Sequence, residues 1–361
     1  MENEKDIERL IQSSLARRQL LLSAGAARRP VSLLTSLSMS FKPGADGRIR
    51  VLLRDEPPAK VDVSEILRAI PGVDIVWPEQ QSESDNEVRA VICFEHEARI
   101  KLKEQFPALQ MISLGFTGYD EVDVEAFADR GVALYYLPDY SADSVAELTL
   151  ALALASLRKI VECHAAVIDG QWDRKGELRG VELKGKTVAV LGYGRIGAKV
   201  ARLFAAFGCR VLVWVRNPDG RSAEGITFTR DLEEALSKAD IVSVHLPLNK
   251  STERFIDKDK LKFFKQGSIL VNTARGGLID EDALLEALGR GAPRMAALDL
   301  LVEEDPNMNK DSASTRLVQS PNVLATPHIG FKTEEALERK ATEAIRNVVR
   351  FAQGNRENAL P

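Results

Sequence analysis

The stretch VAVLGYGRIG, from Val188 to Gly197, decides the fold of this chain. Its first four residues form a short apolar run typical of a buried parallel strand, and a glycine-rich turn follows directly. A periodic pattern of apolar residues then continues to Phe207 and ends at Gly208, as in an amphipathic helix with a glycine stop. The stretch therefore predicts a strand, a tight turn and a helix, the repeating unit of a parallel α/β sheet.

The three glycines of this turn predict a phosphate-binding function. Gly192 permits the tight turn, Gly194 lets backbone amides approach a phosphate, and Gly197 lets the helix pack close to the sheet. The helix N-terminus, here Arg195 and Ile196, also favours an anion. We therefore predict that the turn binds the pyrophosphate of a nicotinamide dinucleotide.

The end of the following strand bears on which dinucleotide is preferred. An NAD site usually carries Asp or Glu about 20 residues after the turn, where the acid binds the ribose hydroxyls. Here Val215 takes that position, and Arg216 and Asn217 follow it. A missing acid beside an arginine suits a 2′-phosphate, so the sequence favours NADP(H), with NAD(H) possible if Arg216 is only a solvated strand end.

Short apolar runs and helical patterns alternate through most of the chain, as expected for parallel α/β sheets. Before the glycine turn, strands are expected at Ile49–Leu53, Val73–Val76, Arg89–Cys93, Met111–Leu114 and Ala133–Tyr136, and helices at Val63–Ala69, Ala98–Gln105, Val122–Asp129 and Ser144–Leu157. From the turn onward, strands are expected at Thr187–Leu191, Arg210–Val215, Ile241–Leu246, Ser268–Asn272, Met295–Leu300 and Val323–Ala325, and a final helix at Thr333–Phe351.

These two series predict two α/β domains. Six strands with intervening helices match a doubly wound Rossmann dinucleotide domain. Because the final helix returns to the first series, we expect this domain, 139–330, to be inserted into a smaller flavodoxin-like α/β substrate domain made of 48–138 and 331–361. Residues 1–47 are expected to be an N-terminal extension without assigned chemistry.

Composition excludes several classes of protein. The net charge of −4 shows no basic excess, which argues against a nucleic-acid partner. The longest apolar run, Leu148–Leu157, ends at Arg158 and is shorter than the roughly 18 residues of a membrane span. Three cysteines without CxxC spacing argue against a metal site and for a reducing, cytoplasmic location.

Three polar residues stand where strands of the second series end, and ligands of open α/β sheets gather at the carboxyl ends of strands. They are Arg275 in VNTARGGLID, Glu304 in ALDLLVEEDP and His328 in ATPHIG. Hydride transfer to a 2-oxo acid needs a cation for the carboxylate, a proton donor for the developing alkoxide, and a group that tunes that donor. Arginine, histidine and glutamate meet those needs in that order.

Several blocks of sequence, in this order, make the chain resemble a known family. They are GYDEVDVEAFADRGV, SADSVAELTLAL, GKTVAVLGYGRIG, HLPLNKSTERFIDKDKL, LVNTARGGLIDEDALLEAL and NVLATPHIGF. From Arg48 to about Leu360 the chain resembles the D-isomer-specific 2-hydroxyacid dehydrogenases, which include glyoxylate/hydroxypyruvate reductases and phosphoglycerate dehydrogenases. The resemblance implies a homodimeric NAD(P)-dependent oxidoreductase that acts on a small 2-oxo or 2-hydroxy acid.

The resemblance also implies catalytic roles. Arg275 would bind the carboxylate and carbonyl oxygen of the substrate, and His328 would be the acid in reduction and the base in oxidation. Glu304 would pair with His328 and keep the imidazolium available near neutral pH. The family usually has its acid directly before a proline, and here Asp305 precedes Pro306, so Asp305 is the alternative to Glu304.

Further residues are implied to bind the ligands. Asp299 would bind the nicotinamide carboxamide, and backbone around Pro247 and Thr273 would line the cofactor. The backbone amides of Thr117 and Gly118 would hold the substrate carboxylate.

Two departures from the family narrow the substrate. Phosphoglycerate dehydrogenases tend to have an arginine or serine where this chain reads Phe94-Glu95-His96-Glu97, and two acids would repel a phosphate. The sequence after Gly354 is also too short for the regulatory domain that many of those enzymes carry. A small unphosphorylated 2-oxo acid such as glyoxylate or hydroxypyruvate is therefore expected, with phosphoglycerate as an alternative.

Two other functional classes are alternatives to this dehydrogenase. Corepressor-type proteins that sense the cofactor share this fold and keep the arginine and histidine, so Arg275 and His328 do not exclude such a binding protein. An L-type lactate or malate dehydrogenase is disfavoured, because those chains open with the dinucleotide turn and here the turn begins at Gly192.

Overall fold

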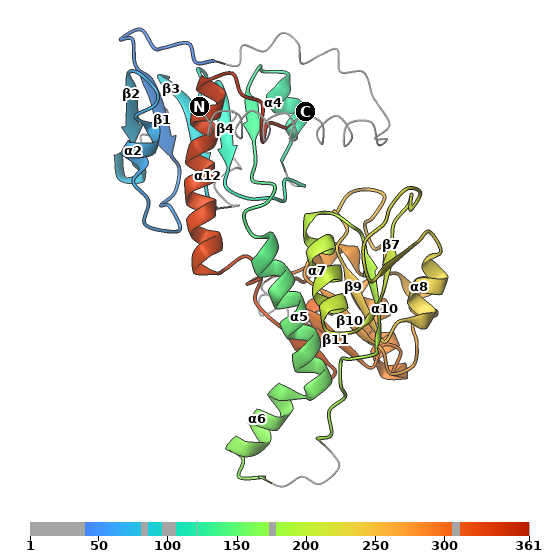
Figure 1. Cartoon of the computed structure of the whole chain (residues 1–361). Helices are drawn as coiled ribbons and strands as arrows, with labels where there is room; N and C mark the ends of the chain where they lie inside the picture. The colour runs from blue at the N-terminus through green and yellow to red at the C-terminus, as the bar shows by residue number, and fades with distance from the viewer. Residues whose placement is uncertain are drawn as a thin grey trace, which may run out of the picture.

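The computed structural model describes residues 40–80, 86–95, 106–120, 122–172, 178–304 and 311–360. The described chain forms two lobes, each built on a parallel β-sheet with helices beside it (Figure 1). Most of the expected extension and the helix expected at Ala98–Gln105 lie outside the described residues. Among the helices that are described, none is both long and apolar enough to cross a membrane.

The first sheet has the strand order β2-β1-β3-β4-β5, and all its pairs are parallel. Its strands are β1 (Ile49–Leu53), β2 (Val73–Val76), β3 (Val88–Cys93), β4 (Met111–Leu114) and β5 (Ala133–Tyr135). This order is that of a flavodoxin-like sheet. All five strands agree with the sequence prediction. The inner strands β3 and β4 are wholly buried, whereas the edge strand β2 is only partly buried and carries Asp74.

Among the described residues, three α-helices belong to this lobe, and one of them comes from the far end of the chain. They are α2 (Val63–Leu67), α4 (Val124–Ala128) and α12 (Glu334–Ala352). Helix α12 begins at Thr333, whose side chain accepts a hydrogen bond from the amide of Ala336. It lies along the first sheet, where the Ser113 hydroxyl donates to the Ala344 carbonyl at 2.7 Å (Figure 1).

The second sheet has the order β12-β11-β10-β9-β6-β7-β8 and is parallel throughout. Its strands are β6 (Thr187–Leu191), β7 (Arg210–Trp214), β8 (Ile226–Thr229), β9 (Ile241–Val244), β10 (Ile269–Asn272), β11 (Met295–Leu298) and β12 (Val323–Ala325). The chain winds outward from β6 in both directions, which defines a doubly wound Rossmann sheet. The six-strand prediction missed β8, because ITFT is a partly exposed edge strand that lacks a continuous apolar run.

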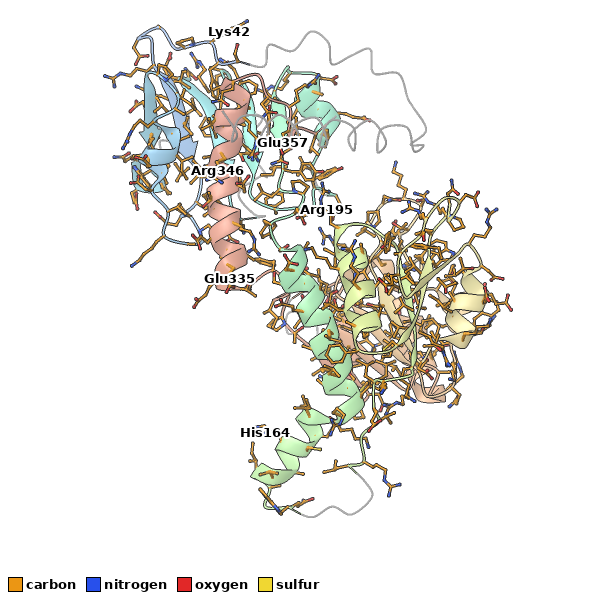
Figure 2. The ribbon with its side chains drawn as sticks, in the orientation of Figure 1. Lys42, His164, Arg195, Glu335, Arg346 and Glu357 are labelled. Atoms are coloured by element: carbon orange, nitrogen blue, oxygen red, sulfur yellow. The ribbon has the colours of Figure 1, made fainter. Side chains whose placement is uncertain are left out.

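The helices of the second lobe are α5 (Ala142–Arg158), α6 (Ile160–Ile168), α7 (Arg195–Ala206), α8 (Leu232–Lys238), α9 (Lys258–Leu261), α10 (Glu281–Arg290) and α11 (Ala313–Gln319). Helix α5 starts at the junction of the lobes and packs on the second sheet, which explains its apolar sequence (Figure 1). Lys159 then adopts a left-handed conformation and breaks the helix. Helix α6, which the sequence analysis missed, projects away from the lobe, with His164 on it (Figure 2).

Candidate active site

The glycine turn joins β6 to α7, and two of its glycines are required by the protein itself. Gly192 has a φ of 102°, and a Cβ there would lie 2.5 Å from the carbonyl oxygen of His245. A Cβ on Gly197 would strike the carbonyl oxygen of Gly192. Gly192 therefore allows the turn, and Gly197 allows α7 to start against it.

Gly194 differs, because a Cβ at this position would meet nothing within 4 Å and its backbone is extended. Space is left beside it at the N-terminus of α7, where the first turn contains no acidic side chain. Arg195 lies there, at the end of the lobe that faces the first lobe, with its Nε 3.8 Å from the carboxylate of Asp139 (Figure 2). Open backbone and a helix N-terminus whose own first turn carries no acid fit a dinucleotide pyrophosphate.

The loop after β7 carries cationic side chains. Arg216 is exposed and makes no hydrogen bond or ion pair with the described residues. Arg221 donates from Nε to the carbonyl of Asn217 at 3.1 Å, and Arg230 pairs with Asp219 at 2.9 Å. Asp219 is therefore already paired with a guanidinium, while Arg216 remains available.

His328 lies in the loop after β12 and pairs with Glu304. Its Nδ1 is 3.1 Å from Oε2 of Glu304, and the ring packs edge-on against Phe331 with centroids 5.3 Å apart. The backbone of His328 is left-handed, with φ 51°, a conformation that residues other than glycine adopt rarely and often at functional sites. The alternative acid, Asp305, lies outside the described residues.

Asp299 holds the loop that carries His328. Its buried carboxylate accepts hydrogen bonds from the Thr326 hydroxyl at 2.6 Å and from the amides of Ile329 and Gly330 at 2.9 and 2.8 Å. The amide of His328 also donates to the Asp299 carbonyl at 2.9 Å. These bonds fix the left-handed conformation of His328. The nicotinamide contact expected of Asp299 stays a prediction.

The loop that carries Glu304 is anchored by a buried acid, Glu281, at the start of α10. Its carboxylate accepts from the amide of Val302 at 2.8 Å and from the hydroxyl of Ser314 at 2.6 Å. Ser314 in turn accepts from the amide of Glu303 at 3.1 Å. Sequence reasoning missed the role of Glu281, although the segment LIDEDALLEAL shows an acid in the first turn of the helix.

Arg275 follows β10, and its loop is shaped by Asn272. The buried Asn272 side chain donates to the Arg275 carbonyl at 2.8 Å and accepts from the amide of Ala274 at 3.0 Å. A Cβ on Gly276 would overlap the backbone of Leu301, so that glycine lets the loops after β10 and β11 touch. Sequence reasoning missed Asn272, although its position as a polar residue at the end of an otherwise apolar strand could have indicated such a role.

Gly118 meets Arg275 from the other lobe. A Cβ on Gly118 would coincide with Nη2 of Arg275, so the guanidinium lies directly on this glycine. Thr117 is fixed by a hydrogen bond from its hydroxyl to the Leu137 carbonyl at 2.6 Å. The residues expected to hold the substrate carboxylate are thus adjacent to the arginine expected to bind it.

The two remaining predicted cofactor residues lie after neighbouring strands of the second sheet. Thr273, which follows β10, is buried and its hydroxyl is 2.8 Å from that of Thr149 in α5. Pro247, after β9, is exposed, and its carbonyl accepts from the Thr252 hydroxyl at 2.5 Å. Strand β9 is the neighbour of β6 on the side opposite β7, and β10 is the neighbour of β9. Pro247 and Thr273 therefore follow adjacent strands on that side of the sheet.

Fold and site together define a two-domain α/β protein with a dinucleotide turn and a histidine–carboxylate pair at the carboxyl edge of its Rossmann sheet. Residues 150–330 match the family model described as the NAD-binding domain of D-isomer-specific 2-hydroxyacid dehydrogenases. The chain belongs to this family.

Relatives support this assignment along most of the chain. Glyoxylate reductase from Thermococcus litoralis is 36% identical over 263 residues, which are 70% of this chain and 77% of that protein. D-3-phosphoglycerate dehydrogenase from Methanocaldococcus jannaschii is 40% identical over 252 residues, 68% of this chain. The match covers only 47% of that dehydrogenase, so the chain spans about half of its length.

Solved structures share the fold. The D-lactate dehydrogenase of Aquifex aeolicus, complexed with NAD and lactic acid, superposes with a TM-score of 0.72 at 27% identity over 85% of this chain and 96% of that one. An acyclic imino acid reductase complexed with NADPH and D-Arg gives 0.73 at 27% identity over 87% and 100%. Both nicotinamide cofactors therefore occur on this fold.

Proposed function

We propose that this protein is an NADP(H)-dependent reductase of a small 2-oxo acid such as glyoxylate or hydroxypyruvate. The observation that carries the proposal is the His328–Glu304 pair at 3.1 Å. A carboxylate on Nδ1 leaves Nε2 free to exchange a proton with a substrate. The same sheet edge presents Arg275, a cation that suits a carboxylate.

The residues would divide the reaction between them. The nicotinamide supplies a hydride to C2 of the 2-oxo acid when it is bound. Arg275 and the amides of Thr117 and Gly118 bind the substrate carboxylate, and the guanidinium polarises the C2 carbonyl. His328 donates its proton to the developing alkoxide from Nε2, while Glu304 stabilises the imidazolium until that transfer.

A panel of 2-oxo acids tests the reaction. We expect the protein to oxidise NADPH with glyoxylate or hydroxypyruvate and to act poorly on phosphohydroxypyruvate, because Glu95 at the end of β3 would repel a phosphate. Inertness toward every 2-oxo acid by protein that still binds NADPH would overturn the proposal. A preference for the phosphorylated substrate would favour a phosphoglycerate dehydrogenase instead.

The preference for NADP(H) is supported by the exposed Arg216 and the absence of an acid at Val215. We expect Arg216→Ala to weaken NADPH binding about tenfold or more, since a charge-assisted bond to a phosphate is lost, and to leave NADH binding unchanged. Arg290→Ala, which removes an exposed arginine at the end of α10, is the matched control. Equal affinities for both cofactors in wild type and Arg216→Ala would contradict the preference.

We further propose a homodimer that uses α5 and α6. The projecting helix exposes large apolar side chains, among them Ile160, Val161 and Ile168, and Trp172 follows with 84% exposure. Such a patch is typical of a protein interface. Ile168→Asp should therefore produce monomers in sedimentation analysis, and an unchanged dimer would place the interface elsewhere.

Domain limits and location complete the proposal. We propose the substrate domain at 48–138 and 331–361 and the cofactor domain at 139–330, a division supported by the return of α12 to the first sheet. A cytoplasmic location is supported by Cys93, Cys163 and Cys209, none of which forms a disulfide.

A further inference from the structure

Asp120 contacts Arg275, the arginine that is proposed to bind the substrate, from the opposite lobe. Its Oδ1 accepts from Nε of Arg275 at 3.3 Å, and the two side chains remain only 26% and 29% exposed. Nη1 of Arg275 donates to the Ala274 carbonyl at 2.7 Å, and Nη2 lies on Gly118. Two of the three guanidinium nitrogens therefore have a hydrogen-bond partner in the protein, and the third, Nη2, lies against Gly118, whose amide is proposed to hold the substrate carboxylate.

The loop that carries Asp120 is a fixed platform. Thr117 is tied to the Leu137 carbonyl, and the ring of Tyr119 packs edge-on against Tyr136 with centroids 5.3 Å apart. The Tyr119 carbonyl also accepts from the amide of Val122 at 2.9 Å. Because the platform belongs to the first lobe and Arg275 to the second, the ion pair sets the guanidinium relative to both halves of the site.

We propose that Asp120 is a positioning residue that orients Arg275 for the substrate carboxylate, an inference that rests on the proposed function. An arginine side chain loses rotamer freedom when it binds a ligand. A guanidinium already held through Nε loses less when the substrate arrives, so binding is stronger.

The first experiment compares variants by steady-state kinetics. We expect Asp120→Ala to lower kcat/KM about tenfold, mainly by raising KM, because misplacement of a binding group by a fraction of an ångström is costly. Asp120→Asn keeps the Oδ1 acceptor and should lose less. Asp74→Ala is the matched control, since Asp74 pairs with Arg50 at 3.4 Å in the same lobe with 35% and 32% exposed side chains.

A second experiment distinguishes positioning from general destabilisation. NADPH affinity should be unchanged in Asp120→Ala, while affinity for oxamate, an inert analogue of a 2-oxo acid, should fall with kcat/KM. In an Arg275→Lys background, Asp120→Ala should have little further effect, because the guanidinium that Asp120 orients is absent from the lysine variant.

The outcomes separate this inference from the function on which it rests. A wild-type protein inert toward all 2-oxo acids overturns both. An active wild type, with kcat/KM of Asp120→Ala unchanged or raised, overturns the positioning role alone. Equal losses in the Arg275 and Arg275→Lys backgrounds also overturn it, because Asp120 would then act independently of the arginine.

Discussion

Oε2 of Glu304 lies 3.1 Å from Nδ1 of His328, and the backbone of that histidine is left-handed with φ 51°. The pair is partly open to solvent, with 31% of the histidine side chain exposed, so a substrate can reach it. Neither residue is placed by its own helix or strand. Asp299 fixes the histidine loop and Glu281 fixes the glutamate loop, so two buried acids support the pair.

His328→Asn tests the proton donor without removing the backbone conformation. Asparagine tolerates the left-handed region, so the fold should be retained. Loss of a general acid should lower kcat about 10²–10⁴-fold while NADPH affinity stays the same. Unimpaired reduction would contradict the role of His328, whereas a cell-level effect that survives the substitution would favour a binding protein on this fold.

Asp299→Asn tests the support of the histidine loop. The amides of Ile329 and Gly330 donate to different oxygens of Asp299, so the amide nitrogen of an asparagine would face one of these two donors in a buried site. The free energy of unfolding should fall by about 1–3 kcal/mol and kcat should fall with it. Asp280→Asn, which retains a good N-cap for α10, is the control in thermal unfolding and should change little.

Gly118→Ala tests the contact between the lobes. Its methyl group would occupy the position of Nη2 of Arg275, so the guanidinium must move. We expect a loss of kcat/KM of about tenfold or more with normal NADPH binding. Gly289→Ala is the contrasting substitution, because open space and a helical backbone should make it neutral or stabilising by up to about 1 kcal/mol. Full activity of Gly118→Ala would show that Arg275 does not bind from this position.

The buried side chain of His245 makes the free energy of unfolding depend on pH. Burial lowers the pKa of His245 from 6.5 to about 3, so the unfolded chain takes up a proton below about pH 6.5 that the folded protein refuses. The free energy of unfolding should therefore fall by up to about 1.4 kcal/mol per pH unit as the pH drops below that value.

The comparison uses denaturant unfolding of two variants at neutral and mildly acidic pH. His245→Asn should reduce this slope while keeping a partner for Ser243, which bonds the ring at 2.7 Å. His164→Asn, on the exposed face of α6, should leave the slope unchanged. Equal slopes in both variants would assign the acid sensitivity to other groups.

Sequence patterns predicted most strands of both sheets, because buried parallel strands are short, mainly apolar runs such as VAVL of β6. They failed at β8, an edge strand with threonines, and at α6, whose apolar side chains face outward instead of into a core. Residues of the candidate site were predicted because each follows a strand. Asn272, Glu281 and Asp120 were missed, because each contacts residues that are close only in the folded chain or in its own loop.

The sequence by itself determined the strand–turn–helix unit around Gly192, the succession of two α/β series along the chain, and the family. These features depend on local periodicity and on motifs. The resemblance already implied that Glu304 pairs with His328. Only the tertiary structure decided that Asp299 holds the histidine loop and that Gly118 and Asp120 approach Arg275 from the other lobe. The contacts of the site join residues 24 to 157 positions apart, from His328 and Glu304 to Arg275 and Gly118 (275 − 118 = 157), and such pairings follow from how the strands are ordered in space.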